Sequence, residues 1–486
     1  MKRILYWFRN DLRLHDNEGF ARARADADEV LPVFVFDPAS FAELPGLGFR
    51  KAGVFRANFL IESVAGLRQS LQSKGADLIV RVGQPAHILA ELAGSTGVNA
   101  VYTSKEVTQE ETDLESDLSK RLKPLNIDLS LFWQSTLYHV RDLPFPVAKL
   151  PEVFTQFRNK VEKYAQIREV IPTPGAVQLA TSVNGEAVAS DPMPTLATFG
   201  FPAQYTADVR AAVPFKGGET VALARLQRYV WEHEHIKTYK ETRNGMLGED
   251  YSSKFSAWLA LGCLSPRLVY QEVKRYEAER HKNDSTYWLI FELIWRDFFR
   301  FVALRYGTRL FKPSGIKHDL SKRWRHDRVL FWQWANGETG IPFIDANMRE
   351  LNSTGFMSNR GRQNVGSFLV KDLGIDWTWG AAYFESLLVD YDPCSNWGNW
   401  NYVAGVGNDP REDRYFNIYS QATRYDEDGK YVKHWLPELV SVPAPAVHIV
   451  SNLSADEQRK YGVALGEDYP MPIINPNKWL KAQKDR

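Results

Sequence analysis

The first 135 residues alternate short apolar segments with longer amphipathic ones. Helical patterns, such as residues 54–73, lie between segments of strand length. The β-rich candidates for strands are residues 3–8, 30–36, 77–82, 100–104 and 128–133. Strands joined by helical crossovers predict a doubly wound, five-stranded parallel sheet.

The pattern becomes helical after residue 218. The segments that suit amphipathic helices are residues 219–239, 283–306, 343–353 and 381–390. Residues from about 170 to 215 are instead rich in Pro, Ala, Ser, Thr and Gly, without a sustained period. We therefore expect an α/β domain (1–135), an interdomain connector (136–217) and an all-α domain (218–486).

Several common catalytic motifs are absent. The segment after the first predicted strand, Arg9-Asn10-Asp11-Leu12-Arg13, contains no G-x-G-x-x-G, so the sheet is not an ordinary NAD-binding unit. Walker A, G-x-S-x-G and H-E-x-x-H sequences are missing as well. His233 and His235 are two positions apart on a predicted helix, which places them on different faces. We expect no metal site.

Composition narrows the class of protein. Hydrophobic residues make up 44%, charged residues 24% and the net charge is +1, which are ordinary globular values. The two cysteines, Cys263 and Cys394, exclude a disulfide scaffold. No apolar run reaches 18 residues and the N-terminus lacks a signal-peptide pattern, so we expect a cytoplasmic protein without a membrane span. Thirteen of the 15 tryptophans follow residue 230, which invites a search for an aromatic cofactor or a base-stacking surface.

Residues 251–266 carry the first candidate site. Ser252 and Ser253 precede an apolar helical run, Gly262 ends that run, and Ser265-Pro266 has the pattern of a helix start. Hydroxyls and a lysine at a helix start suit a phosphate. The alternative is that the serines only cap the helix.

Two other regions combine polar and aromatic residues. Glu292 lies one helical turn from Trp295 and from Arg296, so it could hold a base-like ligand or form a surface ion pair. Residues 359–364 and 390–402 are also dense in polar groups. The second contains many Gly, Asn and Pro residues, and we expect a polar loop whose backbone a ligand could satisfy.

Together these segments resemble the photolyase/cryptochrome family. Residues 7–17, WFRNDLRLHDN, are similar to the opening strand and turn of that family, and the resemblance extends from residue 3 to about 440. Within the family the chain is most similar to cryptochrome DASH, through residues 150–158, 239–246 and 407–411. The resemblance implies a blue-light flavoprotein that carries FAD in its helical domain.

The resemblance also implies an FAD site. Arg362 and Asp390 would pair against the isoalloxazine, Asp392 would meet the ring and ribityl region, and Asn396 would face the flavin N5. The residues expected at the diphosphate and ribityl chain are Tyr239, Ser252, Ser253, Lys254, Phe255 and Ser256.

An electron chain of three tryptophans is implied in the same way. Trp400 would lie nearest the flavin, followed by Trp377 and then by Trp324 toward the surface. Each of these tryptophans could instead be an ordinary core residue.

The resemblance further implies a pocket for a cyclobutane pyrimidine dimer. Its residues would be Glu292, Trp295, Asn359, Arg360, Gln363 and Tyr402, with Glu292 bonded to the base edge. Tyr402 stands where duplex-acting photolyases usually carry tryptophan, and Gln363 where they often carry methionine. The more polar pocket predicts a preference for single-stranded DNA, which largely avoids the cost of base flipping.

Local charge is consistent with a DNA-binding face. Residues 290–375 contain 14 Lys and Arg against 8 Asp and Glu. Such a basic surface around an aromatic pocket suits a nucleic-acid backbone. A mixed, solvated surface is the alternative.

The antenna cofactor implied by the resemblance is 5,10-methenyltetrahydrofolate, held between the domains. Residues 105–110 look like the relevant strand end, with Glu110 as the pterin ligand and Gln109 as the alternative. An exposed glutamate at a helix start is the other interpretation.

Two light-driven functions follow from the resemblance. The first is a monomeric deoxyribodipyrimidine photo-lyase that acts on single-stranded DNA. The second is a blue-light photoreceptor or transcriptional regulator that works by FAD photoreduction. A flavoprotein oxidoreductase without light chemistry is a third hypothesis, and the missing nicotinamide fingerprint counts against it.

Overall fold

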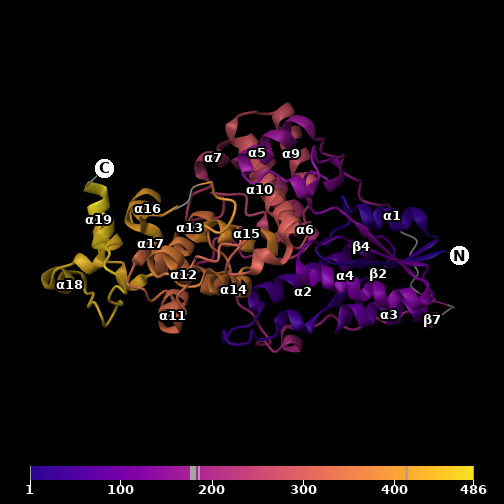
Figure 1. Cartoon of the computed structure of the whole chain (residues 1–486), viewed down its shortest axis with the longest axis horizontal. Coiled ribbons are helices and arrows are strands. Elements are labelled where there is room, and N and C mark those ends of the chain that lie inside the picture. Colours follow the sequence, from indigo (N-terminus) through magenta and orange to yellow (C-terminus); the bar gives the residue numbers. More distant parts are fainter. Residues whose placement is uncertain (1, 176–181, 184–185, 411–413, 485–486) are drawn as a thin grey trace.

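The computed structural model describes residues 2–175, 182–183, 186–410 and 414–484. The molecule is elongated, with a sheet at the N-terminal end and helices filling the middle and the C-terminal end (Figure 1). Arg411, which ends one of the segments similar to cryptochrome DASH, lies outside the described residues.

The N-terminal sheet is parallel and five-stranded, as the sequence predicts. Its strand order is β3-β2-β1-β4-β5. The strands are β1 (Arg3–Phe8), β2 (Glu29–Phe36), β3 (Ile79–Val82), β4 (Ala100–Ser104) and β5 (Asp128–Phe132). The helices between them are α1 (Glu18–Asp26), α2 (Val54–Gln72), α3 (Pro85–Thr96) and α4 (Gln109–Leu122).

Both faces of this sheet are buried. Tyr6 and Phe8 of β1 share one apolar cluster with Phe20 of α1, whereas Leu5 and Trp7 share another with residues of α3 and α4. Alternate side chains of a strand point to opposite faces, so a sheet with helices on both sides needs apolar residues at nearly every position.

The segment after β1 joins the sheet to the helical domain. Leu12 N donates to Leu261 O at 3.2 Å, and Arg13 donates to Gly262 O at 2.8 Å. Asp16 forms a buried ion pair with Arg267 at 2.6 Å. Gly262 has φ +67°, and a Cβ there would lie 2.0 Å from Asn10 O, so the close approach requires glycine. This segment therefore packs closely against the start of the helical domain.

The connector packs against both domains, because its helix α5 (Phe154–Tyr164) contacts α10 (Asp284–Tyr306) of the helical domain. The connector also contains an antiparallel pair of short strands, β6 (Ser182–Val183) and β7 (Glu186–Ala187). Asp191 N donates to Val80 O at 2.9 Å, and Arg50 donates to Phe199 O at 2.6 Å.

The rest of the chain is helical. Its central helix, α10, contacts α5, α7, α9 and α15. The helices are α6 (Glu219–Gln227), α7 (Tyr239–Thr242), α8 (Ser256–Ala260), α9 (Pro266–Glu279), α10 (Asp284–Tyr306), α11 (Arg328–Asn336), α12 (Pro342–Thr354), α13 (Asn359–Ser367), α14 (Trp377–Leu387), α15 (Pro393–Ala404), α16 (Ile418–Tyr425), α17 (Lys430–Trp435), α18 (Ala455–Tyr461) and α19 (Asn477–Lys484).

The prediction of a polar loop over residues 390–402 is wrong, because most of this segment is helix α15. Asp392 caps the helix by accepting a hydrogen bond from Ser395 N at 2.7 Å, and Pro393 occupies the first turn. Gly398 does not break the helix. Phe299 of α10 packs against it so closely that a Cβ there would lie 2.3 Å from the ring.

The expected single helix over residues 219–239 is interrupted. Helix α6 ends in a π-helical turn, Arg228–Glu232, and Glu234 has φ +52°. A 3-10 turn, His235–Thr238, then leads into α7. None of the helices that the structure describes has the length and apolar character needed to cross a bilayer.

Candidate functional site

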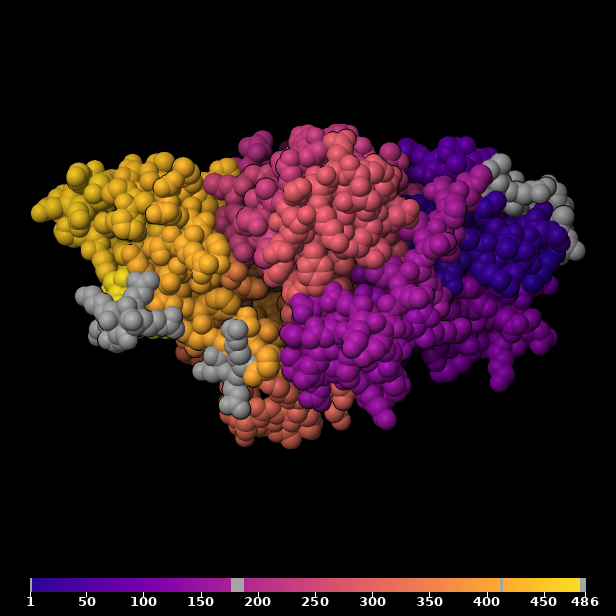
Figure 2. Space-filling view, turned by 90° about the horizontal axis from the view of Figure 1, so that it is seen from above, coloured from indigo at the N-terminus to yellow at the C-terminus, as the bar shows by residue number. Residues whose placement is uncertain are grey.

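The helical domain contains a cavity of about 490 Å³. Its walls come from the loop before α8 and from α10, α13, α14 and α15. The surface is hollowed between the magenta connector and the orange helical segments (Figure 2). Cofactor sites in proteins have volumes of about 300–1,000 Å³.

Most of the predicted site residues line this one cavity. They come from segments spread between residues 239 and 402, and the fold brings them together. They are Tyr239, Ser252, Ser253, Lys254, Phe255, Ser256, Glu292, Trp295, Asn359, Arg362, Gln363, Asp390, Asp392, Asn396, Trp400 and Tyr402.

The loop before α8 offers a buried cation to the cavity. Arg225 holds the loop by donating to Ser252 O at 3.2 Å and to Ser253 O at 3.0 Å. Lys254 has φ +60°, and its Nζ lies 3.1 Å from the centroid of the Tyr251 ring. That ammonium is buried and has no hydrogen-bond partner among the described residues, and burial lowers the pKa of Lys254 well below its usual value. An anion in the cavity would provide the missing partner.

A partly buried ion pair lies on another wall of the cavity. Arg362 of α13 donates to both carboxylate oxygens of Asp390 at 2.9 and 3.0 Å, and its Nε donates to Met357 O at 2.9 Å. The predicted pair is therefore formed. Asn396, one turn into α15, donates to Ala381 O at 3.0 Å.

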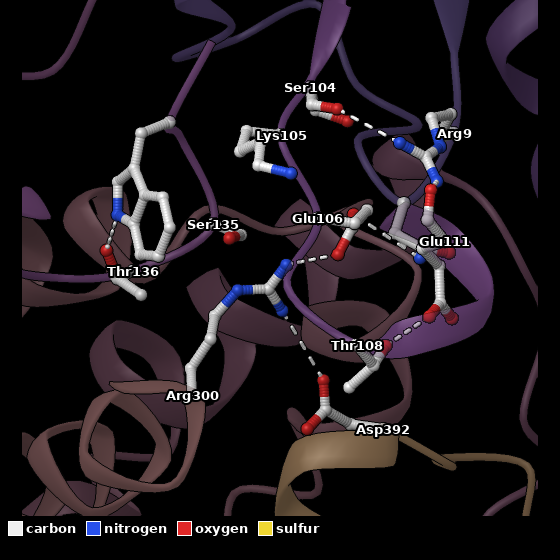
Figure 3. A network of polar contacts seen from close by, with 12 residues as sticks. Arg9, Ser104, Lys105, Glu106, Thr108, Glu111, Ser135, Thr136, Arg300 and Asp392 are labelled. Atoms are coloured by element: carbon white, nitrogen blue, oxygen red, sulfur yellow. Dashed lines mark hydrogen bonds and ion pairs between the residues drawn. The ribbon is translucent and has the colours of Figure 1, made fainter. Parts of the chain in front are cut away.

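Asp392 links the cavity to the α/β domain. Arg300 of α10 lies between Asp392, 3.8 Å away, and Glu106, which follows β4 (Figure 3). Arg300 and Glu106 are buried. A charged guanidinium at this depth needs carboxylate partners, and the two that it has belong to different domains.

Glu292 faces the cavity but does not pair with Arg296. Its partner is Arg243, whereas Arg296 donates to the carbonyl groups of Ser135 and Leu259. Burial raises the pKa of Glu292, and the Arg243 guanidinium opposes that shift. A surface ion pair between Glu292 and Arg296 is thus excluded.

An aromatic wall stands beside Glu292. Trp295 stacks on Phe154 of the connector with ring centroids 3.6 Å apart, and Tyr402 meets it edge-on at 6.1 Å. Arg360 does not line the cavity. It donates to Gln363 at 2.9 Å and lies over the Tyr425 ring at 4.5 Å.

Positive charge gathers around Arg360. Burial and the neighbouring guanidinium groups of Arg243, Arg424 and Arg414 lower the pKa of Arg360. Arg243 and Arg414 also line the cavity, and neither was predicted from the sequence as a site residue. Arg243 could have been found from the sequence, because it lies in the segment 239–246 that resembles cryptochrome DASH.

Shared neighbours bring the three predicted tryptophans into one region of the helical domain. Trp400 lines the cavity and packs against Gly380, one turn after Trp377 in α14, where a Cβ would lie 2.4 Å from the indole. Trp377 and Trp324 each donate to the carbonyl oxygen of Pro313 at 3.0 Å. Trp377 is fully buried and Trp324 is half-buried, and electron transfer through the three indoles stays a prediction.

The predicted folate residues lie in the α/β domain. Glu110 is the second residue of α4, is largely exposed and pairs with Lys51. Gln109 donates to Asp113 at 2.6 Å. Neither contacts the cavity in the helical domain, and the assignment of Glu110 to a pterin stays a prediction.

Comparisons with known proteins agree with this architecture. Residues 4–175 match the family model described as DNA photolyase, and residues 288–486 match the FAD binding domain of DNA photolyase. Cryptochrome DASH from Synechocystis is 53% identical over 484 residues, which cover 99% of this chain and 97% of that protein.

Solved structures show the same relationship. A Synechocystis cryptochrome has a TM-score of 0.94 and 51% identity, and the match covers 100% of this chain and 99% of that one. A class III photolyase from Agrobacterium tumefaciens has a TM-score of 0.85 and 28% identity, with coverage of 100% and 98%.

The protein is thus a flavoprotein with a parallel-sheet N-terminal domain and a helical FAD-binding domain. The chain belongs to the photolyase/cryptochrome family, and its relatives at about 50% identity are cryptochromes DASH. The cavity fits FAD. It would present to a diphosphate the Lys254 ammonium, which has no hydrogen-bond partner among the described residues, and to a polar ring edge the Arg362–Asp390 pair.

Proposed function

We propose that this protein repairs cyclobutane pyrimidine dimers in single-stranded DNA with blue light. The observation that carries the proposal is the position of Glu292. It lies on the wall of the FAD cavity and is partly buried, one helical turn from Trp295 and in an ion pair with Arg243. Arg243 is one of the arginines that gather around Arg360. A carboxyl group, an aromatic face and positive charge are the chemistry that a flipped-out pyrimidine pair needs.

The protein residues would bind and orient the lesion. Glu292 bonds the base edge, while Trp295 and Tyr402 contact the apolar faces of the dimer. Arg243, Arg360 and Arg414 offer their charge to the DNA phosphates. Reduced FAD, when bound, supplies an electron under light that splits the cyclobutane ring and then returns, so the reaction involves no net oxidation.

The preference for single strands rests on pocket polarity. Tyr402 and Gln363 line the cavity, and Gln363 also accepts a hydrogen bond from Arg360. A polar wall has its own hydrogen-bonding demands and gains less from an apolar dimer face than tryptophan or methionine would. Less binding energy is then left for unstacking a base from a duplex, which costs a few kcal/mol.

A folate antenna is a further part of the proposal. We infer that 5,10-methenyltetrahydrofolate binds near Glu110, on the α/β side of the interdomain contact. A Glu110→Gln variant should retain FAD and lose folate, and equal folate content in both proteins would rule this residue out.

The test is light-driven repair of matched oligonucleotides. Single- and double-stranded substrates with one dimer are illuminated with native protein, Glu292→Gln and Glu241→Gln, the last being an exposed glutamate on α7. We expect repair of the single strand, and a loss of about tenfold or more for Glu292→Gln, since hydrogen bonds to charged groups contribute about 1.5–3 kcal/mol. Equal repair of both substrates would refute the strand preference. No light-dependent repair of either would refute the enzyme.

The second candidate function is light sensing, and the series Trp400, Trp377 and Trp324 favours it. Such a series can reduce photoexcited oxidised FAD, and the change in charge would alter binding to DNA or to a protein partner. Sensing rather than repair is the function if Trp400→Phe removes the light response in cells while Glu292→Gln leaves it intact.

A further inference from the structure

Outside the FAD cavity, the structure places two histidines and an aspartate together. The helical turn Arg228–Glu232 ends just before His233, and the helix does not continue through His235, because Glu234 adopts a left-handed conformation with φ +52°. The two imidazole rings therefore approach to 5.4 Å between centroids. The expectation that these histidines point to different faces is wrong for this reason.

Asp250 completes the group. Its Oδ2 lies 3.2 Å from His235 Nε2, and one ligand atom from each of His233, His235 and Asp250 lies within 4.8 Å of the other two. A tetrahedral zinc site with bonds of about 2.0–2.1 Å holds its ligand atoms about 3.3 Å apart. The pair His235–Asp250 already has this spacing, and a small rotation of exposed His233 would bring in the third ligand.

A second observation points to a missing partner. His235 Nε2 is shielded from solvent and has no hydrogen-bond partner among the described residues, although Asp250 is near. The contact is therefore close but poorly aligned for a hydrogen bond. A metal ion between the two atoms would satisfy both lone pairs.

The charge around the group does not oppose a cation. Arg225 donates to Asp250 Oδ1 at 2.7 Å and to Glu249 at 2.9 Å, and Arg228 pairs with Glu249. The positive charges of the two arginines balance the negative charges of the two carboxylates. Arg225 takes one carboxylate oxygen of Asp250 and leaves Oδ2 facing the histidines, as an outer-shell partner orients a metal ligand.

We propose that His233, His235 and Asp250 form a binding site for a divalent transition-metal ion such as Zn²⁺. Two imidazoles and one carboxylate suit zinc, with a fourth position open to water. The ion would join the end of α6 to residues 249–250, directly before the loop Ser252–Phe255 of the cavity. Arg225 connects the two segments, because it donates both to Asp250 and to the Ser253 carbonyl of the loop.

The proposal can be tested by metal titration without any light chemistry. Chelator-treated, FAD-loaded protein is titrated with Co²⁺, whose visible absorption reports coordination by nitrogen and oxygen, and then with Zn²⁺ as competitor. We expect one equivalent to bind. His233→Gln and His235→Gln should each bind at least about 100-fold more weakly, since loss of an outer-shell partner alone costs roughly 10–100-fold.

An exposed histidine elsewhere provides the control. His281→Gln should bind Co²⁺ like the native protein, because His281 is exposed and lies outside the group. FAD content and circular dichroism show whether each variant is folded, and exposed His233 is the variant least able to disturb the fold. Absence of stoichiometric binding, or equal binding by native protein and both histidine variants, would overturn the proposal.

Discussion

At the scale of single residues, the cavity is supported by a buried carboxyl group. Glu350 of α12 accepts a hydrogen bond from the Tyr431 hydroxyl at 2.6 Å and is 2% exposed. Burial raises the pKa of Glu350 from 4.5 to about 7, although Lys254 and Arg362 oppose the shift. The group is therefore neutral in the folded protein at a pH where the unfolded chain is ionised.

This shift predicts a dependence of stability on pH. Between pH 4.5 and about 7 the folded protein holds a proton that the unfolded chain has released. The contribution of Glu350 to stability must then fall as pH rises through this window and level off above it, by about 3 kcal/mol in total at 1.36 kcal/mol per pH unit. Glu350→Gln removes this titration and can still accept the bond from Tyr431.

The measurement is thermal unfolding of Glu350→Gln and of native protein at pH 5 and at pH 8. The free energies of unfolding of the two proteins should shift relative to each other by about 3 kcal/mol between these pH values. We expect the variant to gain relative stability at the higher pH. Glu427→Gln, at an exposed position, should show a constant difference. A constant difference for Glu350→Gln as well would contradict the assignment.

At the scale of elements, two glycines make different contacts with the same indole. A Cβ on Gly380 of α14 would lie 2.4 Å from Trp400 and 2.6 Å from Leu369. On Gly366 of α13 it would lie 3.7 Å from Trp400, an ordinary contact. The spacing of α14 and α15 thus depends on Gly380 and not on Gly366.

These glycines form a matched pair of substitutions. Gly380→Ala should displace Trp400 and destabilise the protein by about 1–3 kcal/mol, the usual cost of overpacking a core. Gly366→Ala should be neutral or stabilising by up to about 1 kcal/mol, since alanine favours a helix. Thermal unfolding and near-UV circular dichroism of the indoles check both. Similar behaviour of the two variants would show that the contact is not tight.

Sequence patterns predicted some elements well, and the reasons are local. The central strands β1 and β2 are buried on both faces, so each is a nearly continuous apolar run between turns. The predicted ends of all five strands differ from the observed ones by two residues at most. The start of α9 was also predictable, because Ser265 and Pro266 signal a helix by themselves.

Other elements depend on contacts that no local pattern contains. Helix α15 has Gly398 because Phe299 of α10 needs the space, and the sequence alone makes that glycine look like a helix breaker. Glu292 pairs with Arg243, 49 residues away, rather than with its helical neighbour Arg296. Glu234 adopts a left-handed backbone conformation, which glutamate rarely does. The approach of His233 to His235 therefore has no signal in the sequence.

At the scale of the whole molecule, the two domains are joined by buried polar groups. Asp16 accepts from Arg267, and Glu219 of α6 accepts from the backbone N–H groups of Leu14 and His15. Arg300, between Glu106 and Asp392, makes a second connection. Because unpaired buried charges are costly, separating the two domains would lower the stability of both.

Breaking one of these pairs should therefore destabilise the entire molecule. Asp16→Asn leaves Arg267 without its carboxylate, and we expect a loss of about 3–5 kcal/mol. Calorimetry, with flavin fluorescence as a reporter of the helical domain, should show that domain unfolding at a lower temperature. Asp428→Asn, which removes an exposed pair with Lys430, should leave the transition unchanged. An unaltered midpoint in Asp16→Asn would mean that the domains are held otherwise.

The central claim is that the cavity holds a flavin with Trp400 beside it, and its absorption spectrum before and after blue light tests this most directly. Native protein with an external thiol should show flavin absorption that bleaches on illumination, and Trp400→Phe should keep most of that absorption. A purified native protein without flavin absorption, or equal bleaching of both proteins, would contradict the account.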